Sequence, residues 1–375
     1  MAFFKVTQRS KKSKARMGVI TTQHGSIQTP SFVPVATKGT LKSIPPNQFQ
    51  EIGVQVAFVN TFHLTVHPGV DIIKKFGGIH KYARLDIPLM SDSAGFQVFS
   101  LGDGKQNKAV KTREGDQAPL EKIEEAGVRF RSPRDGTRMI FTPEISMQNQ
   151  EKIGADLLMA FDECIYHGAT YDYTKNATDR THRWLVRCIQ AKKRTDQYLY
   201  GIIQGGVFKD LREESAQFVS QQNIDGVAIG GVAIGESKRE IREQVRWVAP
   251  YLPENKPVHL LGIGQIDDIK DAIGYGIDTF DCVEATRLAR NGIIYTKAGK
   301  KYDRLDITKV AYQADKKALQ QTCACYACKN FSRSFVHHLF KEKELFGYYL
   351  ASYHNLHFFA EFFREIRRDI KSGKL

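Results

Sequence analysis

Short, nearly all-apolar runs recur along most of this chain, and amphipathic segments separate them. Such runs are typical of strands that are buried on both faces of a parallel sheet. The seven runs cover residues 54–60, 88–92, 155–162, 198–204, 226–231, 257–264 and 278–281, and the clearest helical segments cover residues 174–194, 209–223, 238–248 and 267–275. Repeated alternation of strand and helix predicts a parallel α/β fold. Seven strand candidates favour a closed (β/α)₈ barrel over an open sheet.

Polar residues stand at the carboxyl ends of four of these runs. They are Asp92, Asp162, Gln204 and Asp281, and glycines lie beside two of the runs. The carboxyl ends of barrel strands meet at one rim, where barrel enzymes have their active sites. Any one of these residues alone could be a turn or cap residue, but four together predict a shared pocket.

The charge balance indicates a polyanionic partner. The 375 residues include 55 Lys and Arg against 41 Asp and Glu, which leaves a net charge of +14. A surplus of this size favours nucleic-acid binding, although solubility alone is the competing explanation. No apolar run is long enough for a membrane span, and the first residues lack the apolar core of a secretory signal. We therefore expect a cytoplasmic protein.

A cysteine cluster near the C-terminus predicts a metal site. Three of the six cysteines follow a C-x-C-x₂-C pattern. In a reducing compartment this density indicates thiolate ligands, and one imidazole would complete a closed, structural zinc site. The three are Cys323, Cys325 and Cys328, and the candidate fourth ligands are His337, His338, His354 and His357. We expect a barrel with an N-terminal extension over residues 1–315 and a zinc-binding helical subdomain over residues 316–375.

Two carboxylates at one rim suit a retaining exchange at a sugar carbon. One carboxylate would be the nucleophile, and the other would protonate the leaving group and deprotonate the incoming one. Asp92 and Asp281 could take these roles. Asp162 could accept hydrogen bonds from a purine edge, and Gln204 with the backbone at residues 230–231 could bind the other edge. Composition alone does not separate this reaction from oligosaccharide hydrolysis.

Several motifs resemble the tRNA-guanine transglycosylases, also called queuine tRNA-ribosyltransferases. The match runs in order from about residue 16 to beyond residue 360. The motifs are SDSAGFQVFS, FRSPRDGT, MAFDEC, GIIQGGVF, DGVAIGGVAIGE, FDCVEATRLARNG, CACYAC, SRSFVHHLF and YHNLHF. The resemblance implies a (β/α)₈ barrel with a zinc-binding region. It also implies exchange of guanine at the wobble position of tRNAs with a G-U-N anticodon, by a homodimer.

The resemblance also implies roles for matching positions. Asp281 matches the nucleophile that attacks the ribose anomeric carbon, Asp92 matches the general acid/base, and Asp162 matches the residue that binds the purine edge. The other expected base contacts are Gln204, Gly231, the stacking aromatic Phe96, Cys164, Ile234 and Leu261. Arg287 and Arg290 resemble anticodon-loop contacts. The family's zinc ligands correspond to Cys323, Cys325, Cys328 and His354.

Ile234 bears on the incoming base. Bacterial enzymes of this family have a bulky aliphatic residue there, and queuine-using eukaryotic enzymes have glycine. A branched side chain should crowd the cyclopentenediol of queuine, so we expect 7-aminomethyl-7-deazaguanine, as in queuosine synthesis. Direct use of queuine is the alternative.

The chain departs from the family pattern at several places near the expected site. They include Ala94, Glu284, Ala285 and Leu288, where the family usually has glycine, leucine, proline and a polar residue, and the stretch IYHGAT after Cys164, which lacks the usual threonine and prolines. They bear most on the choice of base and of tRNA.

Two other functional classes compete with this interpretation, a non-catalytic RNA-binding accessory subunit and a sugar-processing barrel enzyme. The presence of both expected catalytic aspartates disfavours the first class. The cysteine cluster and the positive charge disfavour the second.

Overall fold

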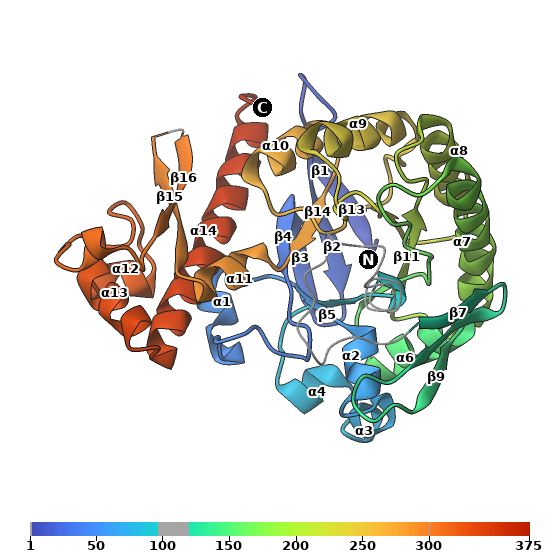
Figure 1. Cartoon of the computed structure of the whole chain (residues 1–375). Helices are drawn as coiled ribbons and strands as arrows, with labels where there is room; N and C mark the ends of the chain where they lie inside the picture. Colours follow the sequence, from blue (N-terminus) through green and yellow to red (C-terminus); the bar gives the residue numbers. More distant parts are fainter. Residues whose placement is uncertain (1, 97–119, 300) are drawn as a thin grey trace.

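The computed structural model of the chain describes residues 2–96, 120–299 and 301–375 (Figure 1). Its centre is an eight-stranded parallel sheet in the order β4-β14-β13-β12-β11-β10-β6-β5. A parallel bridge between Val35 and Phe58 joins the two end strands, so the predicted (β/α)₈ barrel is confirmed. The strands are β4 (Ser31–Pro34), β5 (Ala57–Val59), β6 (Leu89–Ser91), β10 (Leu157–Met159), β11 (Tyr198–Ile203), β12 (Gly226–Ile229), β13 (Val258–Leu260) and β14 (Thr279–Cys282).

All seven predicted runs contain a barrel strand, and β4 is the strand that the pattern missed. Its sequence, SFVP, is fully buried, but Ser31 and the prolines at positions 30 and 34 interrupt its apolar residues, so no continuous run stands out. It pairs in parallel with β14, and Asp281 lies opposite Val33 in that register. The missing strand therefore lies directly beside the expected nucleophile.

Helices surround the barrel, as Figure 1 shows. The predicted segment 238–248 is α9 without a shift, whereas the segment predicted at 174–194 begins earlier because Thr170 caps the helix by accepting from the Tyr173 amide. The helices that precede the C-terminal part are α1 (Phe49–Ile52), α2 (Thr61–Val66), α3 (Val70–Lys75), α4 (Ile79–Ala83), α6 (Pro143–Ile153), α7 (Tyr171–Ala191), α8 (Lys209–Gln221), α9 (Lys238–Val248), α10 (Ile266–Gly274) and α11 (Glu284–Arg290). Three short 3₁₀ helices are η1 (Pro46–Gln48), η2 (Ala249–Tyr251) and η3 (Val310–Tyr312).

Two three-stranded antiparallel sheets accompany the barrel in the described residues, and the pattern of apolar runs did not predict them. A meander of β1 (Phe4–Arg9), β2 (Arg16–Thr22) and β3 (Gly25–Thr29) packs on the barrel interior, where the ring of Phe3 stacks on Tyr198 at 3.8 Å. The second sheet, β7 (Leu120–Glu124), β8 (Gly127–Arg131) and β9 (Arg138–Phe141), precedes α6. Both sheets alternate buried and exposed residues, so they lack continuous apolar runs.

The C-terminal part combines a hairpin with three helices. The hairpin is β15 (Ile293–Ala298) and β16 (Lys301–Asp306), and the helices are α12 (Tyr326–Asn330), α13 (Arg333–Lys341) and α14 (Leu345–Lys371). Figure 1 shows α14 between the barrel and the α12–α13 pair. Phe359 of α14 stacks on Phe32 of β4 at 4.4 Å, which ties this helix to the barrel wall. Among the described residues, no helix is both long enough and apolar enough to cross a lipid bilayer.

Candidate active site

Asp92 follows β6 at the carboxyl rim of the barrel and is held by three donors. The backbone amides of Thr61 and Ala94 donate to Asp92 Oδ1 at 2.7 and 3.2 Å. Asn60 Nδ2 donates to Oδ2, and Asn60 also caps α2 by accepting from the His63 amide. The carboxylate is therefore fixed by the ends of two neighbouring strands, β5 and β6.

The surroundings of Asp92 make its proton easy to exchange near neutral pH. Burial raises the pKa of Asp92 to about 7, against the lowering effect of the Thr61 and Ala94 amides. The negative charges of Asp281 and Asp162 raise this pKa further, so the three carboxylates lie close enough to interact. A carboxyl group with a pKa near 7 can both give and take a proton.

Asp281 lies on β14 and receives two hydrogen bonds at one oxygen. The Gly262 amide donates to Oδ1 at 2.9 Å, and His259 Nε2 lies 3.1 Å from the same atom. His259 is fully buried, and its Nδ1 lies 2.9 Å from Thr279 Oγ1. Since a carboxylate only accepts, Nε2 carries the proton and Nδ1 accepts from the threonine hydroxyl. Sequence reasoning missed His259; the one signal was a histidine inside an apolar strand.

Asp162 follows β10 and joins the group through side-chain hydrogen bonds. Ser93 Oγ donates to Oδ1 at 2.9 Å, and Gln204 Nε2 donates to Oδ2 at 2.7 Å. Burial raises the pKa of Asp162 to about 6, although both of these bonds lower it. Gly95 permits this packing, because a Cβ there would lie 2.5 Å from the Asp162 carbonyl oxygen. The structure thus joins Asp162 and Gln204 by a direct hydrogen bond, and Ser93 ties Asp162 to the turn that follows Asp92.

Glycines 230 and 231 pass close to Gln204. A Cβ on Gly231 would lie 2.5 Å from Gln204 Oε1, and Gly231 has a φ of +62°, so only glycine fits without strain. Gln204 Oε1 is buried and has no hydrogen-bond partner in the described part of the chain. Buried polar atoms are normally paired, so this oxygen is available to a ligand donor.

Arg212 of α8 holds this glycine loop from behind, and sequence reasoning missed it. Its guanidinium is fully buried and donates to the carbonyl oxygens of Gly206, Gly230 and Gly231 at 2.6 to 2.7 Å. Burial lowers the pKa of Arg212 to about 10, which still leaves it charged at neutral pH. Because the Gly230 and Gly231 carbonyl oxygens are both bound to Arg212, the glycine loop is held in one orientation. An arginine in an amphipathic helix gives no sequence signal of such a role.

The remaining expected base contacts lie around this loop. Ile234 is 6% exposed, and its amide donates to Glu236 Oε2 at 2.6 Å. Leu261 approaches Gly230 and precedes the Gly262 amide that binds Asp281. Cys164 is half-buried, and burial together with the charge of Asp162 raises the pKa of its thiol well above the ordinary value.

Phe96 and Ala94 lie in the turn after Asp92. Phe96 is 41% exposed and is the last described residue before the gap at 97–119. Ala94 has a φ of +73°, the left-handed region that favours glycine. The family's usual glycine at this position suits that conformation, and the alanine adds strain beside Asp92.

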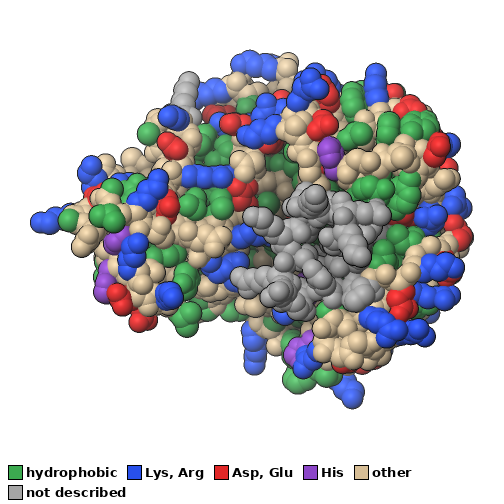
Figure 2. All heavy atoms as spheres, in the orientation of Figure 1, with side chains coloured by type: hydrophobic (Ala, Val, Ile, Leu, Met, Phe, Trp, Pro, Cys, Tyr) green, Lys and Arg blue, Asp and Glu red, His purple; other side chains and the backbone are tan. Residues whose placement is uncertain are grey.

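Helix α11 begins three residues after Asp281 and carries both expected RNA contacts. Arg287 is exposed, and Arg290 is half-buried with Nη1 donating to the Thr286 carbonyl oxygen at 2.9 Å. Glu284, a departure from the family, accepts from Arg304 Nη2 and Gln265 Nε2, both at 2.6 Å. The negative charge of Glu284 is therefore paired with Arg304 of the β15–β16 hairpin. Figure 2 shows Lys and Arg side chains spread over the visible face, with Asp and Glu among them.

The other two departures at α11 are packing residues. Ala285 is fully buried, and its carbonyl oxygen accepts from Asn355 Nδ2 of α14 at 3.0 Å. Leu288 is partly buried and packs against the hydrophobic core. The altered stretch thus keeps α11 attached to the C-terminal helix.

The cysteine cluster and one histidine form a group that can hold a metal ion. The Sγ atoms of the three cysteines lie 3.2 to 3.7 Å from His354 Nδ1. A tetrahedral zinc site places sulfur and nitrogen about 3.6 Å apart, from bond lengths of about 2.3 and 2.0 Å. His354 Nε2 lies 2.8 Å from the Tyr295 carbonyl oxygen, so it carries the proton and leaves Nδ1 free to coordinate. His337 instead binds the Ile307 carbonyl oxygen at 2.7 Å. The group is Cys323, Cys325, Cys328 and His354.

Comparison with known protein families gives a match over almost the whole chain. Residues 10–375 match the family model described as queuine tRNA-ribosyltransferase. The matched region includes the barrel, the rim aspartates and the cysteine cluster.

Curated relatives are similar along nearly their full lengths. A queuine tRNA-ribosyltransferase of Herpetosiphon aurantiacus is 43% identical over 367 residues, which cover 98% of this chain and 88% of the relative. One from Desulforamulus reducens is 42% identical and covers 99% of this chain and 95% of the relative. One from Staphylococcus haemolyticus is 43% identical, with 97% and 91% covered.

Proposed function

This chain belongs to the queuine tRNA-ribosyltransferase family and is a pentosyltransferase, and from that premise we propose that it exchanges the wobble guanine of G-U-N tRNAs for 7-aminomethyl-7-deazaguanine. The exchange proceeds by double displacement through a covalent bond between Asp281 and the ribose. Each displacement inverts the configuration at C1′, because the attacking atom approaches the face opposite the leaving group, so the two displacements together retain it.

In the first step the Asp281 carboxylate attacks the ribose C1′ of the target guanosine. The new carbon–oxygen bond forms as the bond from C1′ to guanine N9 breaks. Protonated Asp92 gives its proton to the departing guanine and becomes a carboxylate. The hydrogen bonds from Gly262 and His259 hold one Asp281 oxygen, which leaves Oδ2 as the attacking atom.

In the second step the incoming base replaces Asp281. Asp92 takes the N9 proton of the base, N9 attacks C1′, and the bond to Asp281 breaks. Asp92 is then protonated again and ready for the next exchange. A pKa near 7 supports this alternation, because neither protonation state is strongly disfavoured at neutral pH.

Base recognition rests on the buried groups beside these carboxylates. Asp162 accepts from the amino and ring N–H groups of a guanine-type edge, and Gln204 with the Gly231 backbone binds the opposite side. Phe96 stacks on the base. Cys164 and Leu261 complete the walls. Ile234 fills the space near the 7-substituent, which favours the small aminomethyl group over queuine.

The tRNA would be held by positive charge and the zinc-binding region. Arg287 and Arg290 contact the anticodon loop next to the reacting ribose, and binding should weaken with salt as phosphate contacts are screened. A zinc ion at the four-ligand group would support the fold and take no part in the chemistry, because a closed shell leaves no position for water or substrate. We place the protein in the cytoplasm as a homodimer.

One observation carries the proposal: Asp92, Asp162 and Asp281 are far apart in the sequence, but they stand at the carboxyl ends of β6, β10 and β14, which belong to the same parallel barrel. The test is incorporation of radiolabelled guanine into an unmodified G-U-N tRNA, with the same tRNA carrying adenine at the wobble position as control. We expect label in the first tRNA alone. Label in neither would contradict the function.

A further inference from the structure

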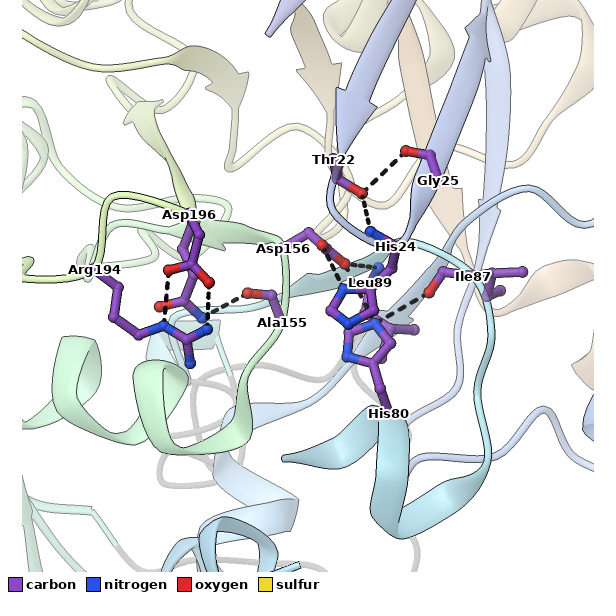
Figure 3. A network of polar contacts seen from close by, with 11 residues as sticks. Thr22, His24, Gly25, His80, Ile87, Leu89, Ala155, Asp156, Arg194 and Asp196 are labelled. Atoms are coloured by element: carbon purple, nitrogen blue, oxygen red, sulfur yellow. Dashed lines mark hydrogen bonds and ion pairs between the residues drawn. The ribbon is translucent and has the colours of Figure 1, made fainter. Parts of the chain in front are cut away.

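A second group of metal-type ligands is distinct from both the rim aspartates and the cysteine cluster, and Figure 3 shows it from close by. His24 lies in the turn between β2 and β3, His80 lies in α4, and Asp156 immediately precedes β10. Because Asp156 stands at the amino end of its strand, the group is at the opposite end of the barrel from Asp92 and Asp281. Nothing in the proposed exchange uses it.

The three side chains converge on a buried carboxylate. His24 Nδ1 lies 2.8 Å from Asp156 Oδ1, and His80 Nε2 lies 3.3 Å from Oδ2. The potential ligand atoms all lie within 4.8 Å of one another. Asp156 is fully buried, His80 is 9% exposed and His24 is 29% exposed by side chain. The group is thus built into the fold on one side and open to solvent on the other.

Asp156 is held firmly in a position to bind a cation. The Leu89 amide donates to Oδ2 at 2.9 Å. The preceding turn is fixed by Gln197 Nε2, which donates to the Ala155 carbonyl oxygen at 2.6 Å. A buried carboxylate held in place in this way is a suitable ligand for a cation.

The open side leads into a surface cavity of about 680 Å³. Both histidines line it, together with Gln23, Gln148 and Glu151. An ion entering from this cavity would meet two imidazoles and one carboxylate and keep at least one position for water. That ligand set suits first-row divalent ions such as Zn²⁺ and Co²⁺, in contrast to the thiolate set of the cysteine cluster.

The rings of His24 and His80 stack at 3.5 Å and are nearly parallel, at 11°. In-plane lone pairs on parallel rings do not meet at one point, so one ring must turn before both can bind an ion. His24 is the ring that can turn, because it lies in a hairpin turn and is the exposed member. His80 must also give up its contact to the Ile87 carbonyl oxygen at 3.1 Å, which makes this site weaker than the cysteine site.

We propose that His24, His80 and Asp156 form a second, exchangeable site for a divalent transition-metal ion that links the β2–β3 turn and α4 to the base of the barrel. The ion binds with three protein ligands and water. The ion lies at the end of the barrel opposite the site where the nucleobases and the tRNA are exchanged. It therefore stabilises that end of the barrel and takes no part in the exchange reaction.

The test is equilibrium dialysis of the full-length protein, already holding one zinc, against micromolar Zn²⁺ with metal quantified per chain. We expect a second bound ion in the wild type and in His338→Ala, which removes an exposed histidine elsewhere. His24→Ala should keep the first ion and weaken the second by more than about 100-fold, since loss of a direct ligand costs more than loss of an outer partner. His24→Ala is chosen because its site in a turn is tolerant of change, and retention of the first ion reports its folding.

Co²⁺ in place of the added Zn²⁺ separates the two sites. Cobalt at the proposed site should show weak visible bands without the strong near-ultraviolet absorption of thiolate ligation, and His24→Ala should remove those bands. The proposal is overturned if the wild type binds only one ion. It is equally overturned if His24→Ala binds the second ion as tightly as the wild type does.

Discussion

The Nε2 atom of His259 lies 3.1 Å from Oδ1 of Asp281, and both residues stand on adjacent parallel strands at the carboxyl rim of the barrel. Thr279 Oγ1 lies on the other side of the ring, so the imidazole is fixed in one tautomer. For the proposed mechanism we therefore assign the buried histidine a positioning role, in which it aims the carboxylate.

Replacing His259 with phenylalanine should slow formation of the covalent intermediate. A hydrogen bond to a charged group contributes about 1.5–3 kcal/mol, which corresponds to a loss of roughly 10- to 100-fold. Single-turnover assays with saturating tRNA would measure it, and KM for tRNA should change little. His259→Gln, which keeps a donor, is the matched control and should recover part of the rate. Equal losses in both variants would indicate damage to packing instead.

The rate of intermediate formation should fall as pH rises through about 7. The first step needs Asp92 protonated, and burial together with two neighbouring carboxylates raises its pKa to about 7. Below that pH the acid form dominates and the rate is at its plateau; above it the acid form is lost tenfold per pH unit. The measurement is the single-turnover rate between pH 5.5 and 9. A rate independent of pH over this range would show that Asp92 is not the acid.

Ile234→Gly should allow queuine to compete as the incoming base. Ile234 is buried, and in the proposed base site its side chain would crowd the cyclopentenediol of queuine. The gain should lie within about 10- to 200-fold in relative kcat/KM, the range for small steric differences. Competition between queuine and 7-aminomethyl-7-deazaguanine on one tRNA measures it. Ile234→Val keeps a branched side chain and should still exclude queuine. Equal use of both bases by the unaltered protein would contradict the proposed base choice.

His354→Ala should remove the metal from the cysteine cluster and destabilise the C-terminal helices. Metal binding at such sites is coupled to folding, and His354 also donates to the Tyr295 carbonyl oxygen of the hairpin. Metal content per chain and the thermal midpoint are the measurements, with His338→Ala as control because His338 is exposed. A full metal complement in His354→Ala would assign the fourth ligand elsewhere.

The barrel could be predicted from sequence because its strands are buried on both faces and are therefore continuous apolar runs. The strands β1 to β3 and β7 to β9 could not, because buried residues in them alternate with half-buried or exposed ones and leave no continuous apolar run. The strand β4 was not recognised because Ser31 and Pro34 interrupt its apolar residues, although it lies beside Asp281.

The residues of the candidate site also divide into those that could be predicted from the sequence and those that could not. Asp92, Asp162 and Gln204 could be predicted to lie together because each ends a strand, and hydrogen bonds now join Asp162 to Gln204 and to Ser93 beside Asp92. His259 and Arg212 could not, because each lies inside a regular element and its importance comes from a partner distant in sequence. A buried side chain becomes recognisable as a positioning residue only when the group it holds is known.

The central claim is that Asp281 forms a covalent bond to the tRNA ribose, while Asp92 donates a proton to the leaving base and accepts one from the incoming base. The direct measurement is the amount of protein–tRNA adduct that survives denaturation, for the unaltered protein, Asp281→Asn and Asp92→Asn. We predict an adduct with the unaltered protein, a much slower adduct with Asp92→Asn, and none with Asp281→Asn, which retains the shape of the side chain but loses the nucleophilic charge. An adduct of ordinary yield from Asp281→Asn would contradict the mechanism.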